Sequence, residues 1–460
     1  MTTSKLTIFD VRPRGGSSHP PFLVSPQRIS LAGIAKKRQI SGQAGAHPGN
    51  VGLEKVMAGP LSGVRIVDVT SMLSGPWATM ILADQGADVI KVEATGGDHT
   101  RSLGNRRGGM SSNFLNINRN KRSIALDLKA AGGLAALKKL TATADIFVQN
   151  FRPGVAERLG VGPAILRSLF SRLIYLSISG FGHEGPWAGK PVYDPIIQAA
   201  SGLTTVQAGS DRERPRLIRT VLPDKLAAVT AAQVMAAALY RRERTGEGQH
   251  IRLSMLDAVL YFLWASDMGA QTYPDETGSP QEAASFIDLI YETKDGYMTV
   301  AVMSDKEWRG LCTAVKREDW LADPRFATPA ARDRHVDERL RMTQEVLRSR
   351  TTAEWMTLFE AHDVPCAPAL TRNEVLRHPQ VTSSGIILEY VHHTAGRLRQ
   401  TRAPGQFERT PNELRMGAPS LNEHGDEILR EIGYSDAEIE RLRHDGALGR
   451  KPELANATAA

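Results

Sequence analysis

Cysteine is almost absent from this sequence, which holds only Cys312 and Cys366 among 460 residues. A small secreted fold stapled by disulfides needs many more thiols, so that class is excluded and a reducing, cytoplasmic setting is expected. Neither cysteine has a second one nearby, and we interpret both as small core side chains.

Long apolar runs and metal-binding signatures are also missing. No stretch approaches the ~20 apolar residues that a membrane-spanning helix needs, so no membrane partner is expected. The Walker phosphate-binding pattern, His-Glu-x-x-His and paired Cys-x-x-Cys sites do not occur, so no metal centre is predicted. The adjacent His392 and His393 form an isolated pair, which we expect at the surface.

The positive charge of the chain is concentrated at one end. The formal net charge is +7, but residues 1–56 alone contain eight basic and only two acidic side chains. The nearly neutral remainder offers no basic groove, so no nucleic-acid partner is expected. Residues 1–57 lack hydrophobic periodicity and are rich in Pro, Gly and Ser, which indicates a disordered or mis-annotated extension, with a transit peptide as an alternative.

Strands and helices alternate from Gly63 onward. Strands are predicted at 64–69, 87–92, 122–128, 145–149, 173–179 and after 249, and helices at 74–84, 130–142, 163–170 and 225–244. Alternation at this spacing implies parallel pairing with right-handed crossovers, hence an α/β fold built on an open Rossmann-like sheet. Ligands of such sheets bind beyond the carboxyl ends of the strands.

The later sequence indicates further organisation. We expect a large domain over 58–268, a linker and a smaller α+β domain over 269–385, and a return to the large domain with a C-terminal tail over 386–460. The polar stretch 270–285 is the predicted linker, and 435–443 the predicted last helix.

One glycine pattern resembles a dinucleotide-binding fingerprint. Gly180, Gly182 and Gly185 fit G-x-G-x-x-G after a predicted strand, but Pro186 follows directly and no helix opens there. We therefore interpret the segment as a loop in which the backbone approaches another group closely.

Four acidic residues follow on the predicted active edge of the sheet: Asp194, Asp211, Glu213 and Asp224. Asp224 could equally cap the long helix, and Asp194 could begin a short one. Asp211 and Glu213 lie in a Gly/Ser/Arg-rich stretch, where an exposed turn carboxylate is the ordinary expectation. Composition and spacing alone do not choose among the four.

A series of ordered motifs runs along the chain from about residue 60 to 442. They are Ile66–Thr70 leading to Ser74-Gly75-Pro76, Gly86–Glu93, Gly97-Asp98, Asn118–Asp127, Asn150–Gly154, Arg158–Gly160, Ser179–Gly182, Gly185-Pro186, Gln198–Gly202, Arg244–Gln249 and Asp323–Phe326. With these motifs the chain resembles the class III CoA-transferase family, also called the CaiB/BaiF family.

This resemblance implies an enzyme that transfers CoA from an acyl-CoA donor to a free carboxylic acid through a side-chain carboxylate. The carboxylate forms a mixed anhydride with the acyl group and then a thioester with CoA. Matching the family's pattern assigns the nucleophile to Asp211, with Glu213 as second choice. CoA is then a substrate, and no tightly bound cofactor is expected.

The resemblance also implies a CoA-binding pocket and a quaternary structure. The positions that match the family's pocket are Met72, Leu126, Lys129, Asn150, Phe151 and Arg158. Family members form interlocked dimers, so a homodimer is expected. The identities of the donor and acceptor acids do not follow from the sequence.

Two other functions compete with CoA transfer. A 2-methylacyl-CoA racemase shares the fold and would use Asp194 and Asp224 to move an α-proton. Racemases carry a His-Asp pair where this chain has Tyr193-Asp194, so one face of the substrate would lack its base. The other alternative is a CoA-binding protein without turnover.

Overall fold

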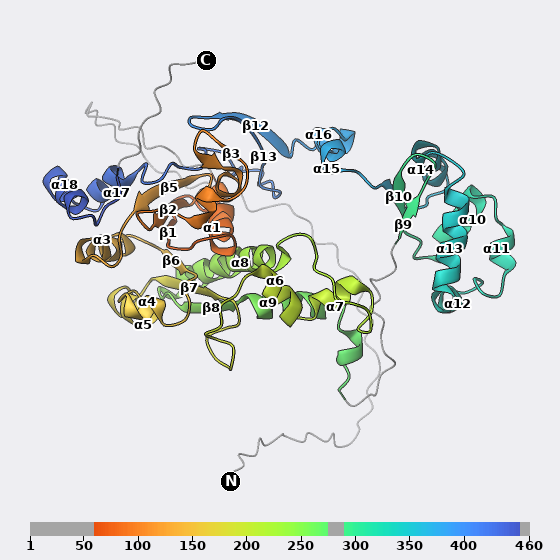
Figure 1. The fold of residues 1–460 in the computed structure, drawn as a ribbon, viewed down its shortest axis with the longest axis horizontal. Coiled ribbons are helices and arrows are strands. Elements are labelled where there is room, and N and C mark those ends of the chain that lie inside the picture. Colours follow the sequence, from red (N-terminus) through yellow and green to blue (C-terminus); the bar gives the residue numbers. More distant parts are fainter. Residues whose placement is uncertain (1–58, 275–288, 451–460) are drawn as a thin grey trace, which may run out of the picture. The chain divides into compact units, whose positions relative to one another are not determined.

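The computed structural model describes residues 59–274 and 289–450 (Figure 1). The predicted N-terminal extension, most of the predicted linker and the last ten residues, 451–460, lie outside the described residues.

The centre of the fold is a six-stranded sheet of order β5-β2-β1-β6-β7-β8, in which every neighbouring pair is parallel. The predicted open parallel sheet is therefore confirmed. Its strands are β1 (Arg65–Asp68), β2 (Asp88–Glu93), β5 (Lys121–Ala125), β6 (Ile146–Gln149), β7 (Ile174–Ser179) and β8 (His250–Ser254).

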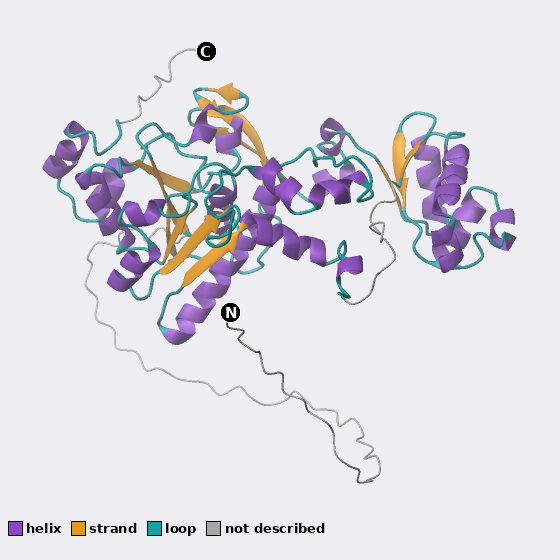
Figure 2. Cartoon of the chain, turned by 60° about the horizontal axis from the view of Figure 1, so that its bottom comes forward, coloured by secondary structure: helices purple, strands orange, loops and turns teal. Residues whose placement is uncertain are grey.

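Helices cover both faces of this sheet (Figures 1 and 2). One face packs against α1 (Ser74–Asp84) and the long α8 (Leu222–Thr245). The other face packs against α3 (Ala131–Thr141), α4 (Val155–Arg158), α5 (Pro163–Leu169), α17 (Gly425–Glu431) and α18 (Asp436–His444). The result is a three-layer α/β structure.

Alternation along the strands produces the two cores. Ile66 and Val89 point to the α1/α8 side, and their neighbours Val67 and Ile90 point to the opposite side. All four side chains are fully buried. Because both faces of a parallel sheet are covered, apolar residues at successive strand positions are buried on opposite sides.

Small residues let α8 lie close to the sheet. Ala228, Ala231 and Ala238 face the strands, with Met235 filling the space between them. The helix begins at Leu222, three residues earlier than the pattern predicts, because Pro223 is tolerated in a first turn. It ends at Thr245, and Gly246 caps it with a φ of +77°, a conformation that suits glycine.

Further short elements connect the layers. They are η1 (His99–Ser102), β3 (Arg106–Arg107), β4 (Met110–Ser111), α2 (Ser112–Leu115), α6 (Asp194–Ala200), α7 (Leu203–Ala208), α9 (Met255–Trp264) and η2 (Gly269–Gln271). The last of these occupies the start of the predicted linker.

Residues 289–368 contain an antiparallel sheet of order β11-β10-β9 and its own aromatic core of tryptophans and phenylalanines. Cys312 is fully buried in that core and Cys366 packs against it, which agrees with the predicted role of both. The elements are β9 (Ile290–Glu292), β10 (Tyr297–Val300), β11 (Cys366–Pro368), α10 (Asp305–Ala314), α11 (Asp319–Ala322), α12 (Pro329–Arg334), α13 (Val336–Leu347) and α14 (Thr352–Ala361).

The elements α15 (Arg372–Val375) and α16 (Pro379–Ser383) are followed by a hairpin of β12 (Ile387–His392) and β13 (Gly396–Thr401). The prediction that His392 lies at the surface is wrong, because this last residue of β12 is buried. Its Nδ1 accepts hydrogen bonds from the backbone N–H groups of Thr394 and Ala395, and its Nε2 contacts the Ala418 carbonyl. The ring thus satisfies the turn amides, which explains its burial. His393 is half exposed.

Candidate functional site

The reversal of strand order in the sheet lies between β1 and β6. The chain runs from β1 outward through β2 to β5, then returns to β6 on the other side of β1. Loops 69–73, 150–154 and 180–193 leave the carboxyl ends of β1, β6 and β7 and surround a pocket of about 250 Å³. This is the position at which open α/β sheets bind ligands.

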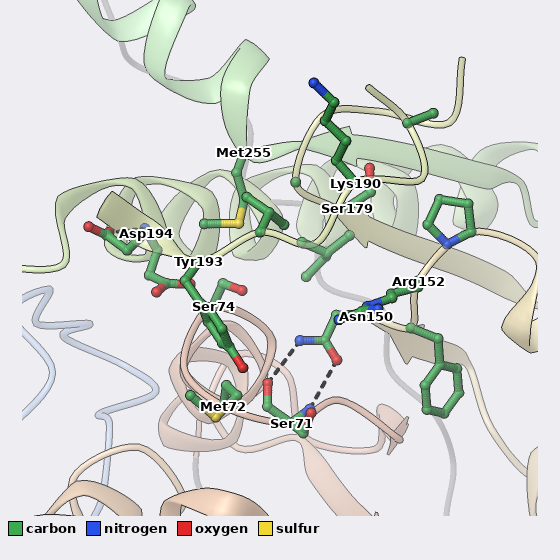
Figure 3. Close-up of a pocket in the computed structure, with 17 residues that line it drawn as sticks. Ser71, Met72, Ser74, Asn150, Arg152, Ser179, Lys190, Tyr193, Asp194 and Met255 are labelled. Carbon is green, nitrogen blue, oxygen red and sulfur yellow. Dashed lines mark hydrogen bonds between the residues drawn. The ribbon is translucent and has the colours of Figure 1, made fainter. Parts of the chain in front are cut away.

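Asn150 joins two of these loops across the reversal point. Its Oδ1 accepts a hydrogen bond from the Ser71 N–H at 3.0 Å, and its Nδ2 donates to the Ser71 carbonyl at 2.8 Å (Figure 3). One side chain therefore satisfies both backbone groups of Ser71 and fixes the distance between the loops.

A buried ion pair holds the 69–73 loop from below. Lys91 Nζ lies 3.0 Å from Asp98 Oδ2 and donates to the Thr70 carbonyl, and both charged side chains are nearly inaccessible to solvent. Asp98 Oδ1 in turn accepts the Met72 N–H at 3.3 Å. Met72 has a φ of +68°, an uncommon conformation for a non-glycine residue that these contacts maintain.

A second buried pair anchors the start of α1. Lys121 Nζ lies 3.0 Å from Asp68 Oδ2 and donates to the Pro76 carbonyl. Thr79 donates to the same Asp68 oxygen. Although burial opposes ionisation of Asp68, Lys121 and Lys91 hold its pKa well below the ordinary value. The end of β1 and the first turn of α1 are thereby fixed together.

Two carboxylates meet at the pocket, Asp194 at the start of α6 and Asp224 in the first turn of α8. Asp194 is 3% exposed. Its Oδ1 accepts from Gln198 Nε2 at 2.7 Å, and its Oδ2 accepts the Asp224 N–H at 3.2 Å. Asp194 therefore caps α8 from a different helix, and both of its oxygens have partners.

The Asp224 carboxylate lies beside the start of a third helix. Ser74, the first residue of α1, is close enough to stabilise the ionised carboxylate and so to lower its pKa. Burial, aided by the negative charge of Asp194, nevertheless raises the pKa of Asp224 to about 6, against the opposing effect of Ser74. Burial also raises the pKa of Asp194. Near neutral pH, Asp224 is mostly ionised and poorly solvated, which is a suitable state for a nucleophile or a base.

The loop after β7 closes one side of the pocket. A Cβ at Gly180 would lie 2.2 Å from Val192 Cγ1, so only glycine permits this close approach, as the glycine pattern predicts. No helix opens between β7 and α6. Lys190 lines the pocket but extends away from Asn150, with its Nζ 4.1 Å from the centre of the Trp187 ring (Figure 3).

The acidic residues of the sequence prediction separate into two groups. Asp194 and Asp224 line the pocket, whereas Asp211 and Glu213 are exposed in the turn between α7 and α8 and do not line it. The short helices α6 and α7 occupy the preceding segment and leave that turn outside the pocket. Asp224 is not the N-cap of α8, because the helix begins earlier and Val221 occupies the cap.

The predicted CoA-binding residues also divide. Met72, Asn150 and Phe151 line the pocket. Leu126 is buried in the core beside α3, while Lys129 and Arg158 are exposed near the ends of β5 and on α4. Sequence reasoning missed Ser71 and Ser74, although a polar segment directly after a buried strand was a usable signal for both.

Within the ranges 59–274 and 289–450, no group of three or more His, Cys, Asp or Glu side chains could hold a metal ion. No helix in those same ranges is both long and apolar enough to cross a bilayer.

Comparisons with known proteins agree with one another. A family model described as CoA-transferase family III matches residues 61–425. Acetyl-CoA:oxalate CoA-transferase of Acetobacter aceti is 34% identical, with 82% of this chain and 97% of that protein covered. Succinyl-CoA:glutarate CoA-transferase of Mus musculus is 31% identical, with 85% and 90% covered. The crystal structure of a CaiB/BaiF family protein from Brucella suis matches with a TM-score of 0.72 at 30% identity, covering 82% of this chain and all of that one.

Proposed function

This chain belongs to CoA-transferase family III, and we propose that it moves CoA from an acyl-CoA donor to a free carboxylic acid through the carboxylate of Asp224. One observation carries the proposal. The Asp224 carboxylate lines the pocket at the reversal point of the sheet, close to Ser74 and beside Asp194, with its pKa raised to about 6.

The proposed reaction needs no external proton donor. An Asp224 oxygen attacks the donor thioester carbon and the carbon–sulfur bond breaks. CoA departs as the thiolate, and the acyl group stays on Asp224 as a mixed anhydride. The thiolate then attacks the aspartyl carbon and expels the donor acid, which gives an aspartyl-CoA thioester. The acceptor carboxylate repeats both steps in reverse and leaves as acyl-CoA, which regenerates Asp224. Backbone N–H groups around Gly180 are suited to stabilise each tetrahedral oxyanion.

The choice of Asp224 differs from the one that the sequence resemblance implies. Counting along the family motif leads to Asp211, but that residue is exposed and outside the pocket lining. Burial and a neighbouring carboxylate support Asp224, since both raise its basicity. Asp211 remains the alternative nucleophile, and the experiment below includes it.

We further propose that the acceptor is a short dicarboxylic acid. The two relatives described above are named for oxalate and for glutarate, both dicarboxylic acids. Arg152 lines the same pocket as Asp224, and we propose that its guanidinium pairs with the second carboxylate. Lys129 and Arg158 are proposed to contact the phosphates of CoA, and Phe151 its adenine.

A homodimer is also proposed. Several large apolar side chains of α8 and α9 are exposed, among them Tyr240, Tyr261, Phe262 and Trp264. An apolar group of this extent is typical of an interface between subunits.

One observation favours a second candidate, racemase-like proton transfer. Two pocket carboxylates with raised pKa values can act as acid and base. This reaction would exchange the α-proton of a 2-methylacyl-CoA with deuterium from the solvent. The CoA transfer proposal expects no such exchange.

The decisive experiment traps the intermediate. The protein is incubated with an acyl-CoA donor, treated with hydroxylamine or borohydride, and digested for peptide mass spectrometry. We expect modification at Asp224, its loss in Asp224→Asn, and its retention in the matched variant Asp211→Asn. Modification at Asp211 would move the nucleophile there. Absence of any acyl-dependent modification, with α-deuterium exchange, would replace the transferase by the racemase.

A further inference from the structure

A buried hydrogen-bond chain runs beneath the pocket through side chains that do not line it. It joins the backbone of Phe151 to Gln149, then Ser177, then His250. We infer that Gln149 is a positioning residue for the CoA substrate, acting through Phe151.

Gln149 is the last residue of β6 and is 4% exposed. Its Oε1 accepts the Phe151 N–H at 2.7 Å. Because a backbone N–H can only donate, the carbonyl end of the amide must face Phe151. The amide nitrogen then donates to Ser177 Oγ at 2.9 Å.

The donor-to-acceptor order of these hydrogen bonds continues across the sheet from β6 to β7 and β8. Ser177 on β7 accepts from Gln149, so its own hydroxyl proton is available for His250 Nε2 on β8, 2.9 Å away. That bond requires an unprotonated Nε2. Burial, with the positive charge of Arg252, lowers the pKa of His250 to about 4, so the ring is neutral near pH 7.

Two consecutive residues after β6 are each held by a hydrogen bond. The Asn150 side chain binds Ser71, and the Phe151 N–H binds Gln149. The turn after β6 is therefore held from two sides before any ligand arrives. A turn ordered in advance saves the ordering cost that would otherwise weaken binding. This inference rests on the proposed contact between Phe151 and CoA.

The test measures CoA binding as well as turnover. Gln149→Met keeps the size of the side chain and removes both hydrogen bonds. We expect the Kd for free CoA by calorimetry, and the KM for the acyl-CoA donor, to rise roughly tenfold while kcat changes by less than about twofold. Gln149→Glu keeps an acceptor for Phe151 and accepts the Ser177 proton with its other oxygen, so CoA affinity should return to within about threefold of the wild type.

Thr141→Val serves as the matched control, because it removes a buried hydrogen bond, from the Thr141 hydroxyl to the Leu137 carbonyl, away from the pocket. It should leave the Kd for CoA unchanged. If Gln149→Met does not fold, Ser177→Ala interrupts the chain at its next link, and it should weaken CoA binding in the same direction.

An unchanged Kd in a folded Gln149→Met or Ser177→Ala variant, or a failure of Gln149→Glu to restore affinity, would overturn the inference. If the wild type binds CoA and the variants weaken that binding, the inference holds even when no CoA transfer is detected. The binding experiment therefore tests the inference separately from the proposed transfer reaction.

Discussion

Asn150 binds both backbone groups of Ser71, accepting its N–H at 3.0 Å and donating to its carbonyl at 2.8 Å. These two bonds cross the point where the strand order reverses. The loop after β1 carries Met72 into the pocket and leads to Ser74, which lines the pocket together with Asp224. The shape of the pocket around the proposed nucleophile therefore depends on a side chain from the neighbouring strand.

Replacement of Asn150 by Asp should impair catalysis more than stability. The carboxylate can still accept the Ser71 N–H, but it loses the donated bond and places negative charge against the Ser71 carbonyl. We expect kcat/KM for CoA transfer to fall by about tenfold to a hundredfold. Steady-state kinetics on the folded variant measures this. A value within twofold of the wild type would contradict a role for the two Asn150–Ser71 hydrogen bonds. Asn113→Asp, at an exposed position, is the control.

The proposed nucleophile predicts an acid limb in the pH profile. Asp224 must be ionised to attack, and its pKa is about 6, so kcat/KM should decline as the pH falls through 6. Burial is the largest cause of the raised pKa and the charge of Asp194 is the next. Asp194→Asn removes that charge, so the limb should move to lower pH. An unchanged limb in Asp194→Asn would exclude Asp224 as the titrating group.

The sheet could be predicted from the sequence because each strand carries a strong local signal. Runs such as Ile146-Phe147-Val148 are apolar, end at polar residues and recur with helices between them. The close approach at Gly180 could also be predicted from the sequence, since it depends on the absence of a side chain at this position.

The nucleophile was harder to predict because it depends on contacts distant in the sequence. Asp224 lies 30 residues from Asp194 in the chain and shares the pocket with Ser74 of another helix. Asp211 carries the same functional group, and only the tertiary structure leaves it exposed. The burial of His392 likewise follows from the Ala418 carbonyl, which sequence patterns do not reveal.

Lys121→Met should destabilise the fold, because it leaves the Asp68 carboxylate buried without its nearest cation. Breaking one partner of a buried pair typically costs about 3–5 kcal/mol in the free energy of unfolding. The double variant Lys121→Met/Asp68→Leu should lose less than Lys121→Met alone, since no unpaired charge remains. Urea unfolding measures both, with the exposed Lys129→Met as control. Equal losses in the single and double variants would contradict the pairing.

Gly180→Ala should disturb the pocket through Val192. The new Cβ would lie 2.2 Å from Val192 Cγ1, so the segment leading to Asp194 must move. We expect a loss of about 1–3 kcal/mol in unfolding free energy, with kcat/KM reduced further than stability alone explains. Gly189→Ala is the matched control on the same loop, because its Cβ would meet no atom within 4 Å. Equal changes in unfolding free energy and kcat/KM in the two variants would contradict a role for the close approach of Gly180 to Val192.

The proposed dimer predicts a change in mass when its apolar surface is charged. Tyr261 is 85% exposed and Trp264 is 52% exposed on α9, a large cost in water if nothing covers them. Tyr261→Glu/Trp264→Glu places two buried charges in any interface formed there, so we expect a monomer by sedimentation at micromolar concentration. Leu169→Glu, at the end of α5 and 59% exposed, adds a charge on the other side of the sheet and should leave the dimer intact. A wild-type protein that sediments as a monomer at the same concentration would remove the dimer proposal, while trapping of an acyl group at Asp224 would still support the chemistry.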